Sequence, residues 1–331
     1  MGLSHTTVLL TGGSSGIGAA TARTLAAAGA RILVAGRNRA RLQAVAEETG
    51  GIALVADLAA PEGPAALAEA AIRAAAIWDS DGYEAAAGAV PRLARMPEPM
   101  SWPVPRADPP GSGPPADGLA IATVRRPARA RPPGPAGPPG PAGPAGPLAA
   151  GDRPAASGID ILVNNAGIGW AGPLAQMSAA KIARMVAVNL TAPIELTRLL
   201  IPTLGAGGRG RVVFISSIAG TTGVRQEAVY SGTKAGLGGF AESLRYELAG
   251  TDVGVSVIFP GVVNTPFFAR RGIPYSRRRP IPISAQRVAR VVLTAIEREQ
   301  PVAFVPRWLG FPAWLHGAAP GTFRTLAARF G

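Results

Sequence analysis

Between residues 11 and 18 the chain reads Thr11-Gly12-Gly13-Ser14-Ser15-Gly16-Ile17-Gly18. The apolar run Val8–Thr11 predicts a short buried strand, and the apolar residues spaced along Ile17–Ala28 predict a helix. Glycines between them permit a tight turn and let the backbone approach a ligand closely. Because a helix begins with unpaired N–H groups and the positive end of its dipole, this turn is predicted to bind an anion such as a phosphate.

Strands and helices alternate on either side of this turn. In residues 1–76 we expect further strands at Arg31–Ala35 and Ile52–Ala56, and helices at Arg39–Glu48 and Glu62–Ala75. In residues 158–331 the expected strands are Ile159–Val163, Arg211–Ser216, Val253–Phe259 and Val302–Val305, and the expected helices are Ala179–Pro202, Val229–Leu248 and Ser284–Arg298. Short strands separated by helices indicate βαβ units. The predicted fold is therefore α/β, a Rossmann-type doubly wound parallel sheet of about seven strands.

Residues 77–157 interrupt this alternation. They hold 19 of the 33 prolines and five consecutive Gly-Pro-X triplets beginning at Gly134. Proline blocks both helix and strand hydrogen bonds, and five triplets are too few for a stable collagen helix. We interpret the segment as a disordered Pro/Gly-rich low-complexity insertion between the two parts of one Rossmann domain. An error in the translated gene model is the alternative.

The composition excludes several kinds of chemistry. The chain has no cysteine, which rules out disulfides and thiolate catalysis, and His5 and His316 are far apart in sequence, so no metal site is expected. The sequence shows no signal peptide and no apolar run of about 20 residues, and we expect a cytoplasmic protein. The net charge is +13, with eleven arginines and two acids from Arg270 onward. This excess favours anionic partners, although GC-rich coding would also produce it.

The end of the second strand indicates which nucleotide would bind. Ala35-Gly36-Arg37 has no acidic residue where an NAD site usually places one to bond the ribose 2′-hydroxyl. Arg37, with Arg39 or Arg41 behind it, suits a 2′-phosphate instead. We therefore expect NADP(H) as the preferred cofactor, with NAD(H) as the alternative. Asp57, after the third strand, is expected to bond the adenine.

A proton-transfer site is predicted farther along the chain. Tyr230 and Lys234 lie four residues apart on one face of a predicted helix, and Ser217 follows the preceding strand. A free tyrosine has a pKa of about 10, too high for efficient acid–base work near pH 7, and a fixed ammonium lowers it. The hydroxyls of Ser217 and Tyr230 would converge on one carbonyl oxygen. Lys234 is one of two lysines in an arginine-rich chain, which indicates that its compact ammonium is needed.

These motifs resemble the short-chain dehydrogenase/reductase (SDR) family, in its classical branch. In order, the matching residues are the glycine turn, Asp57, Asn164-Asn165-Ala166-Gly167, Asn189, Ser217, Tyr230, Lys234, and Pro260-Gly261 with Thr265. The resemblance covers the chain except residues 77–157 and, loosely, the last 40. It implies an enzyme that transfers a hydride between a nicotinamide cofactor and a carbonyl or alcohol.

The resemblance also assigns roles. It makes Tyr230 the general acid in reduction, with Ser217 polarising the carbonyl and Lys234 lowering the pKa of Tyr230 and binding the nicotinamide ribose. Asn189 is implied to hold a water that links Lys234 to solvent; without the resemblance, a structural asparagine would be the simpler reading. The implied cofactor contacts are Gly12, Ser14, Ser15, Gly16, Ile17, Gly18, Arg37, Asp57, Asn164, Ala166, Gly167, Tyr230, Lys234, Pro260, Gly261, Val263 and Thr265. Asn164 would in addition stabilise the sheet. A homodimer or homotetramer is implied, built on the helices beginning near Ala179 and Val229.

The substrate side is less specific in sequence. Phe267, Phe268 and Tyr275 stand among the arginines of residues 270–279, which suits an apolar substrate with an anionic end, although the aromatics could equally pack as a lid. Near the C-terminus, Trp308, Leu309, Phe311, Trp314 and Leu315 indicate either packing or contact with a membrane surface, and Pro306, Gly310 and Pro312 are expected to interrupt any long helix there. No nucleic-acid motif is present. The alternative functions are a non-catalytic NADP-binding regulatory protein and a peripheral membrane-associated reductase for lipid-like substrates.

Overall fold

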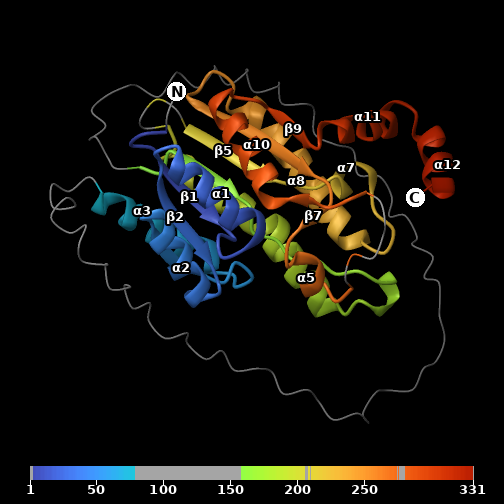
Figure 1. The fold of residues 1–331 in the computed structure, drawn as a ribbon, viewed down its shortest axis with the longest axis horizontal. Coiled ribbons are helices and arrows are strands. Elements are labelled where there is room, and N and C mark those ends of the chain that lie inside the picture. The colour runs from blue at the N-terminus through green and yellow to red at the C-terminus, as the bar shows by residue number, and fades with distance from the viewer. Residues whose placement is uncertain are drawn as a thin grey trace, which may run out of the picture. The chain divides into compact units, whose positions relative to one another are not determined.

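The structure is a computed structural model that describes residues 3–78, 158–205, 208, 210–273, 275 and 280–330. Seven parallel strands form one sheet in the order β3-β2-β1-β4-β5-β6-β9 (Figure 1). Their bounds are β1 Thr7–Thr11, β2 Arg31–Gly36, β3 Ile52–Val55, β4 Ile161–Asn164, β5 Gly210–Ile215, β6 Val253–Pro260 and β9 Val302–Val305. The order reverses beside β1, which pairs with β2 on one side and β4 on the other. The predicted doubly wound sheet is confirmed.

Helices cover both faces of the sheet. On one face lie α1 (Gly16–Ala27), α2 (Arg39–Thr49) and α10 (Ala285–Glu297); on the other lie α3 (Gly63–Ile77), α6 (Ala192–Leu200) and α8 (Ala228–Glu247). Side chains of a strand alternate between faces, so Val8 and Leu10 pack in the first layer and Leu9 in the second. Burial of these strand residues is complete, as the continuous apolar runs of a parallel sheet require.

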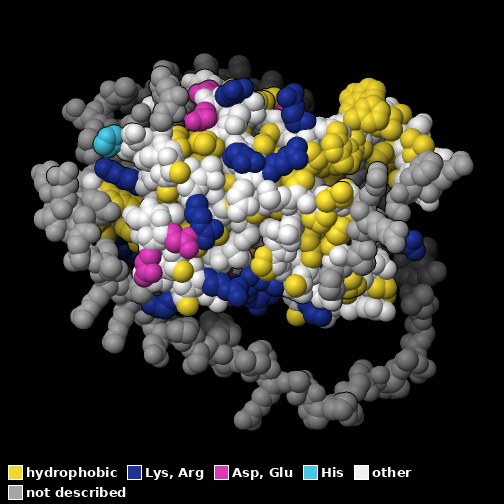
Figure 2. All heavy atoms as spheres, viewed as in Figure 1, with side chains coloured by type: hydrophobic (Ala, Val, Ile, Leu, Met, Phe, Trp, Pro, Cys, Tyr) yellow, Lys and Arg dark blue, Asp and Glu magenta, His cyan; other side chains and the backbone are white. Residues whose placement is uncertain are grey.

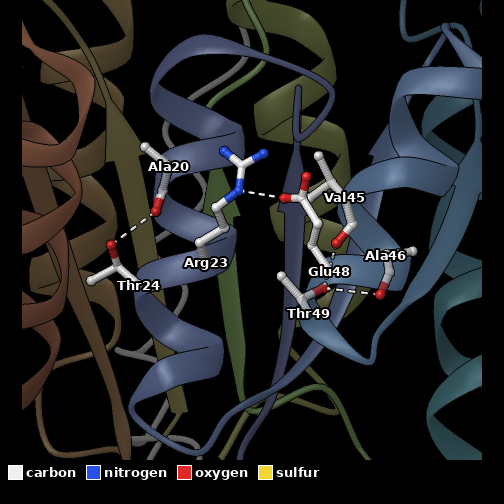
Figure 3. Close-up of polar contacts among 7 residues, drawn as sticks. All are labelled: Ala20, Arg23, Thr24, Val45, Ala46, Glu48 and Thr49. Carbon is white, nitrogen blue, oxygen red and sulfur yellow. Dashed lines mark hydrogen bonds and ion pairs between the residues drawn. The ribbon is translucent and has the colours of Figure 1, made fainter.

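Polar contacts at the far ends of α1 and α2 are exposed and contribute little. Arg23 pairs with Glu48, and both side chains are about half exposed (Figure 3). The hydroxyls of Thr24 and Thr49 donate to carbonyls of their own helices, Thr24 to Ala20 at 2.8 Å. The apolar layer beneath therefore holds these two helices against the sheet.

The chain departs from the predicted helices in two places. The expected helix Ala179–Pro202 is α5 (Ala179–Val186), a π-helical segment (Ala187–Thr191) and α6, and it ends at Leu200. Two short C-terminal helices, α11 (Gly310–Ala318) and α12 (Pro320–Phe330), were not among the predicted helices, although no long helix forms there, as the prolines led us to expect. Pro312 falls in the first turn of α11, where its missing N–H has no intrahelical partner to lose.

Short elements connect the main ones. They are the 3₁₀ turns Leu174–Gln176 and Arg307–Leu309, α7 (Ala219–Thr222), α9 (Phe267–Arg270), and a small parallel pair of strands, β7 (Val263–Asn264) and β8 (Ile283–Ser284). Helix α3 continues to Ile77, and the side chain of Trp78 is buried. The other residues of the expected insertion, 79–157, lie outside the described residues.

Candidate active site

A cavity of about 1000 Å³ opens at the carboxyl edge of the sheet. Its walls include residues that directly follow β1, β2, β3, β4, β5 and β6, among them Gly12, Arg37, Asp57, Asn165 and Ser217. In doubly wound folds, ligands bind at this edge where the strand order reverses. Of the predicted site residues, the cavity brings together Gly12, Ser14, Ser15, Gly16, Ile17, Gly18, Arg37, Asp57, Ala166, Gly167, Ser217, Tyr230, Lys234, Pro260, Gly261, Val263 and Thr265.

The glycine turn between β1 and α1 leaves no room for side chains. Gly12 has a φ of +68°, and a Cβ there would lie 2.8 Å from the Cα of Ala166. A Cβ on Gly18 would lie 2.2 Å from the carbonyl oxygen of Gly12. The side-chain amide of Asn165 donates to the carbonyls of Thr11 (2.9 Å) and Gly12 (3.2 Å). The turn is therefore fixed against the loop that follows β4.

The N-terminus of α1 faces the cavity in a form that suits an anion. Ser15 occupies the N-cap position but makes no side-chain cap hydrogen bond, and the first turn of α1 contains no acid. The Ser15 hydroxyl instead lies 3.2 Å from Nη1 of Arg270, which donates to it. Backbone N–H groups, the helix dipole and a guanidinium thus meet at one point, as a pyrophosphate group requires.

The part of the cavity beside the ends of β2 and β3 carries the expected basic residues. Arg37 and Arg41 line it together with Asn38, whereas Arg39 does not. Asn38 caps α2 by accepting a hydrogen bond from the backbone N–H of Arg41 at 2.9 Å. The cap holds the start of α2, and with it Arg41, beside the cavity. Asp57 also lines this end of the cavity.

Tyr230, Lys234 and Ser217 meet at the other end. Tyr230 and Lys234 lie one turn apart on α8, and both are almost fully buried. The Ser217 hydroxyl accepts a hydrogen bond from the N–H of Ala219 at 3.2 Å and lies close enough to the Tyr230 phenol to lower its pKa. The Lys234 ammonium donates to the carbonyl oxygen of Ile215 at 2.8 Å. A hydroxyl pair beside a fixed cation can bind a carbonyl oxygen and exchange a proton with it.

Burial shifts both pKa values toward the neutral forms. It raises the pKa of Tyr230 to about 12, although the Ser217 hydroxyl acts in the opposite direction, and it lowers the pKa of Lys234 to about 8. The sequence led us to expect that Lys234 would lower the pKa of Tyr230. The net shift is upward, because desolvation outweighs the lowering contributions of Ser217 and Arg271, and the expected role of Lys234 stays a prediction. Tyr230 therefore retains its proton at neutral pH.

Two predicted site residues do not line the cavity. Asn189, fully buried in the π-helical segment, accepts from the N–H of Ile168 (2.8 Å) and donates to its carbonyl (2.9 Å). It still lies near the ammonium, since a Cβ on Gly167 would be 3.5 Å from Asn189 Oδ1 and 3.6 Å from Lys234 Nζ. Asn164 donates to the Thr197 hydroxyl (3.2 Å) behind the sheet. Asn164 does not line the cavity, whereas the neighbouring Asn165 does, and the expected cofactor contact of Asn164 stays a prediction.

Sequence reasoning missed Glu227, and it did not predict the contacts that Asn165 and Arg271 make. Asn165 stands inside the Asn164–Gly167 motif, so its position in that motif is the sequence signal that could have identified it. Glu227 and Arg271 form an ion pair on the cavity wall, but they are 44 residues apart and nothing in the sequence connects them. Within the described residues, no cluster of His, Cys, Asp and Glu could hold a metal ion, and no helix is both long and apolar enough to cross a bilayer.

Comparisons with known proteins agree with this geometry. A family model described as short chain dehydrogenase matches residues 6–78 and 152–273. Ketoacyl reductase HetN from Nostoc sp. is 48% identical over 106 residues, 32% of this chain and 37% of HetN. A short-chain dehydrogenase from Sphingobium yanoikuyae in complex with NADPH has a TM-score of 0.62 at 23% identity, covering 96% of this chain and 95% of that chain. An SDR from Burkholderia phymatum in complex with NAD has a TM-score of 0.65 at 17% identity, covering 96% and 94%.

The sheet order and the anion-binding turn define a dinucleotide-binding α/β protein. The family match defines a narrower class of protein, because the matched residues include strands from both parts of the sheet and residues that line the cavity. The chain belongs to the short-chain dehydrogenase/reductase family. This chain spans about a third of the length of HetN. The two solved structures are 23% and 17% identical to it, and a likeness at that level establishes the fold alone.

Proposed function

We propose that this protein is an NADP(H)-dependent oxidoreductase that reduces a ketone or aldehyde, with Tyr230 as the general acid. The observation that carries this proposal is that Ser217, Tyr230 and the buried Lys234 line the same cavity as the glycine turn. A binding protein alone would need the turn but not the two hydroxyls beside a buried ammonium. The nicotinamide, when bound, would supply or accept the hydride.

The protein's own groups would manage the oxygen and its proton. Ser217 would donate to the substrate oxygen and polarise the carbonyl. Tyr230, whose pKa of about 12 keeps it protonated at neutral pH, would give its phenolic proton to that oxygen as the carbonyl carbon is reduced. Lys234, held at the Ile215 carbonyl, would stabilise the resulting phenolate. A protonated Tyr230 favours the reductive direction.

The cofactor preference follows from the basic end of the cavity. Arg37 and Arg41 would bind a 2′-phosphate, and no acid follows β2 to bond a 2′-hydroxyl. Wild-type protein should bind NADPH at least about tenfold tighter than NADH, the worth of one charge-assisted contact. Arg41→Glu should reverse this order, and Arg39→Glu, outside the cavity, should not. Equal or tighter binding of NADH by the wild type would contradict the preference.

The reaction itself is tested with a panel of carbonyl compounds, followed by NADPH absorbance. Tyr230→Phe should lower turnover by a factor of about 100 or more while NADPH still binds. Tyr246→Phe is the matched control, since Tyr246 is on the same helix and 71% exposed. Undiminished turnover in Tyr230→Phe would reject the mechanism. A wild type that binds NADPH and reduces nothing would favour the non-catalytic alternative.

We also propose a homo-oligomer built on the α5–α6 path and α8, as the family resemblance implies. Light scattering measures it directly, and a monomer at micromolar concentration would contradict it.

A peripheral membrane attachment is the second candidate function. Trp308, Phe311 and Trp314 are each more than half exposed, and hydrophobic side chains gather over α11 (Figure 2). No acid follows Glu299 in the sequence. Tryptophan beside arginine is typical of helices that lie on anionic bilayers. Cosedimentation with anionic vesicles, lost in a Trp308→Ala, Trp314→Ala variant, would support it; a wild type that stays in the supernatant would exclude it.

A further inference from the structure

The ion pair between Glu227 and Arg271 lies on the wall of the cavity, close to the catalytic tyrosine. Glu227 stands three residues before Tyr230 at the start of α8, and Arg271 directly follows α9. The two side chains are only 13% and 9% exposed, in that order. An ion pair this far from water is costly to form, and removing either partner leaves an uncompensated charge. Such a pair needs an explanation beyond stability.

Every described contact of the Arg271 side chain is made inside the protein. Its Nη1 donates to Glu227, its Nε donates to the carbonyl of Ile273 at 3.0 Å, and its guanidinium carbon lies 4.5 Å from the centre of the Phe268 ring. A carboxylate, a carbonyl and an aromatic face together occupy the guanidinium. Arg271 therefore already holds a carboxylate in the position where a substrate could have supplied one.

Among the described residues, the wall beside this pair is largely aromatic. Ring contacts run from Tyr230 to Phe267 (5.5 Å), from Phe267 to Phe268 (5.7 Å) and from Phe268 to Tyr275 (5.4 Å between centroids). The neighbouring Arg270 is directed to Ser15 at the anion-binding turn. Two arginines of the basic rim expected from the sequence, Arg270 and Arg271, are therefore already paired within the protein, and its other members, residues 277–279, lie outside the described residues. Arg225 also lines the cavity, but it is exposed, so water and salt screen its charge.

We propose that Glu227 and Arg271 determine specificity: Glu227 stands in for a substrate carboxylate, so the site accepts uncharged apolar or aromatic carbonyl compounds and rejects those that carry a carboxylate. This rests on the proposed oxidoreductase function. A substrate carboxylate would meet the Glu227 charge and an arginine that is already paired. An amide or ester of the same shape meets no such penalty.

Removing the charge of Glu227 should also produce a gain of function, which a purely structural role of the pair does not predict. Glu227→Gln keeps the shape of the side chain and removes its charge, which leaves Arg271 able to bind a substrate carboxylate. The assay compares para-formylbenzoate with para-formylbenzamide, which differ in charge but hardly in size. Wild type should favour the amide in kcat/KM. Glu227→Gln should shift the ratio toward the carboxylate by roughly 10- to 100-fold, the size of a charge-assisted hydrogen bond.

Two further variants identify which arginine binds the substrate carboxylate. Adding Arg271→Met to Glu227→Gln should abolish the shift, because no buried guanidinium remains. Adding Arg225→Met instead should leave it in place. Equal losses on both substrates in Glu227→Gln, or a shift that survives Arg271→Met, would overturn the proposal. Thermal melts verify that each variant is folded. If Glu227→Gln unfolds, the wild type still tests the proposal, because a higher kcat/KM for the carboxylate than for the amide would overturn it.

A binding measurement separates this proposal from the proposed function. Calorimetric titration with benzoate and with benzamide needs no turnover. Wild type should prefer benzamide, and Glu227→Gln should bind benzoate about tenfold tighter than wild type does. If the wild type reduces neither aldehyde but the titrations behave as expected, the reductase function fails and the specificity pair stands. If benzoate affinity is unchanged by Glu227→Gln, the pair is structural only.

Discussion

Lys234 provides the sharpest test of the electrostatics of this site, because its ammonium is buried with the carbonyl of Ile215 as its hydrogen-bond acceptor. Burial lowers the pKa of Lys234 from 10.5 to about 8. In the unfolded chain the lysine is fully hydrated and keeps its ordinary pKa. Between these two values the unfolded state holds more protons than the folded state, so the free energy of unfolding must rise with pH.

The size of this effect follows from the shift. Each pKa unit is worth about 1.4 kcal/mol, so below about pH 8 the buried charge costs the fold about 3 kcal/mol. The cost disappears as the pH rises from about 8 to about 10.5. From about pH 7 to about pH 9.5, Lys234 should therefore add about 2 kcal/mol to the free energy of unfolding. The raised pKa of Tyr230 acts in the opposite sense, but only above about pH 10.

The measurement is urea unfolding at a series of pH values for wild type, Lys234→Met and Lys181→Met. Lys181 is the other lysine and is exposed, so its replacement controls for the loss of a lysine as such. The methionine at 234 removes the buried charge and also leaves the Ile215 carbonyl without its donor, so the slope and not the absolute value is compared. Lys181→Met should keep the wild-type slope and Lys234→Met should lose it. Parallel profiles for wild type and Lys234→Met would refute the reasoning.

Three further outcomes are expected. Gly18→Ala forces a Cβ to within 2.2 Å of a carbonyl oxygen in the anion-binding turn, so it should lose nucleotide affinity and roughly 2 kcal/mol of stability; unchanged NADPH titration would contradict this. Asn189→Ala leaves the N–H and carbonyl of Ile168 without partners and should cost about 3 kcal/mol in chemical denaturation, whereas a loss below about 1 kcal/mol would mean that water replaces it. Ser217→Ala removes the hydroxyl that lowers the pKa of Tyr230, so the alkaline limb of the pH–rate profile should move upward; a downward shift would be incompatible with the site described.

The sheet and the centre of the site could be predicted because their signals are local. Continuous apolar runs locate the buried strands, and the i, i+4 spacing of Tyr230 and Lys234 puts them on one helix face whatever the tertiary packing. The glycine turn is local in part, since a Cβ on Gly18 would meet the carbonyl oxygen of Gly12, whereas the contacts that exclude a side chain at Gly12 come from Asn165 and Ala166 after β4.

What could not be predicted depends on partners distant in sequence. The π-helical segment at Asn189 forms where that side chain bonds the loop after β4, which periodicity along the helix cannot reveal. Pairing of Glu227 with Arg271 is set by how α9 packs against α8. The pKa of Tyr230 was expected to fall because the sequence supplies the charge of Lys234, while the degree of burial, which decides the sign, is known only from the fold.

The contrast between the two lysines has a practical consequence for chemical labelling. Both are described, one on the surface of α5 and one buried at the end of the cavity. Bulky amine-directed reagents should attach at Lys181 alone among the side chains and leave the catalytic machinery intact. A reagent as small as cyanate could also enter the cavity, where the pKa of about 8 leaves a larger fraction of free amine. The ratio of carbamylation at the two positions would then report occupancy of the cavity without any turnover assay.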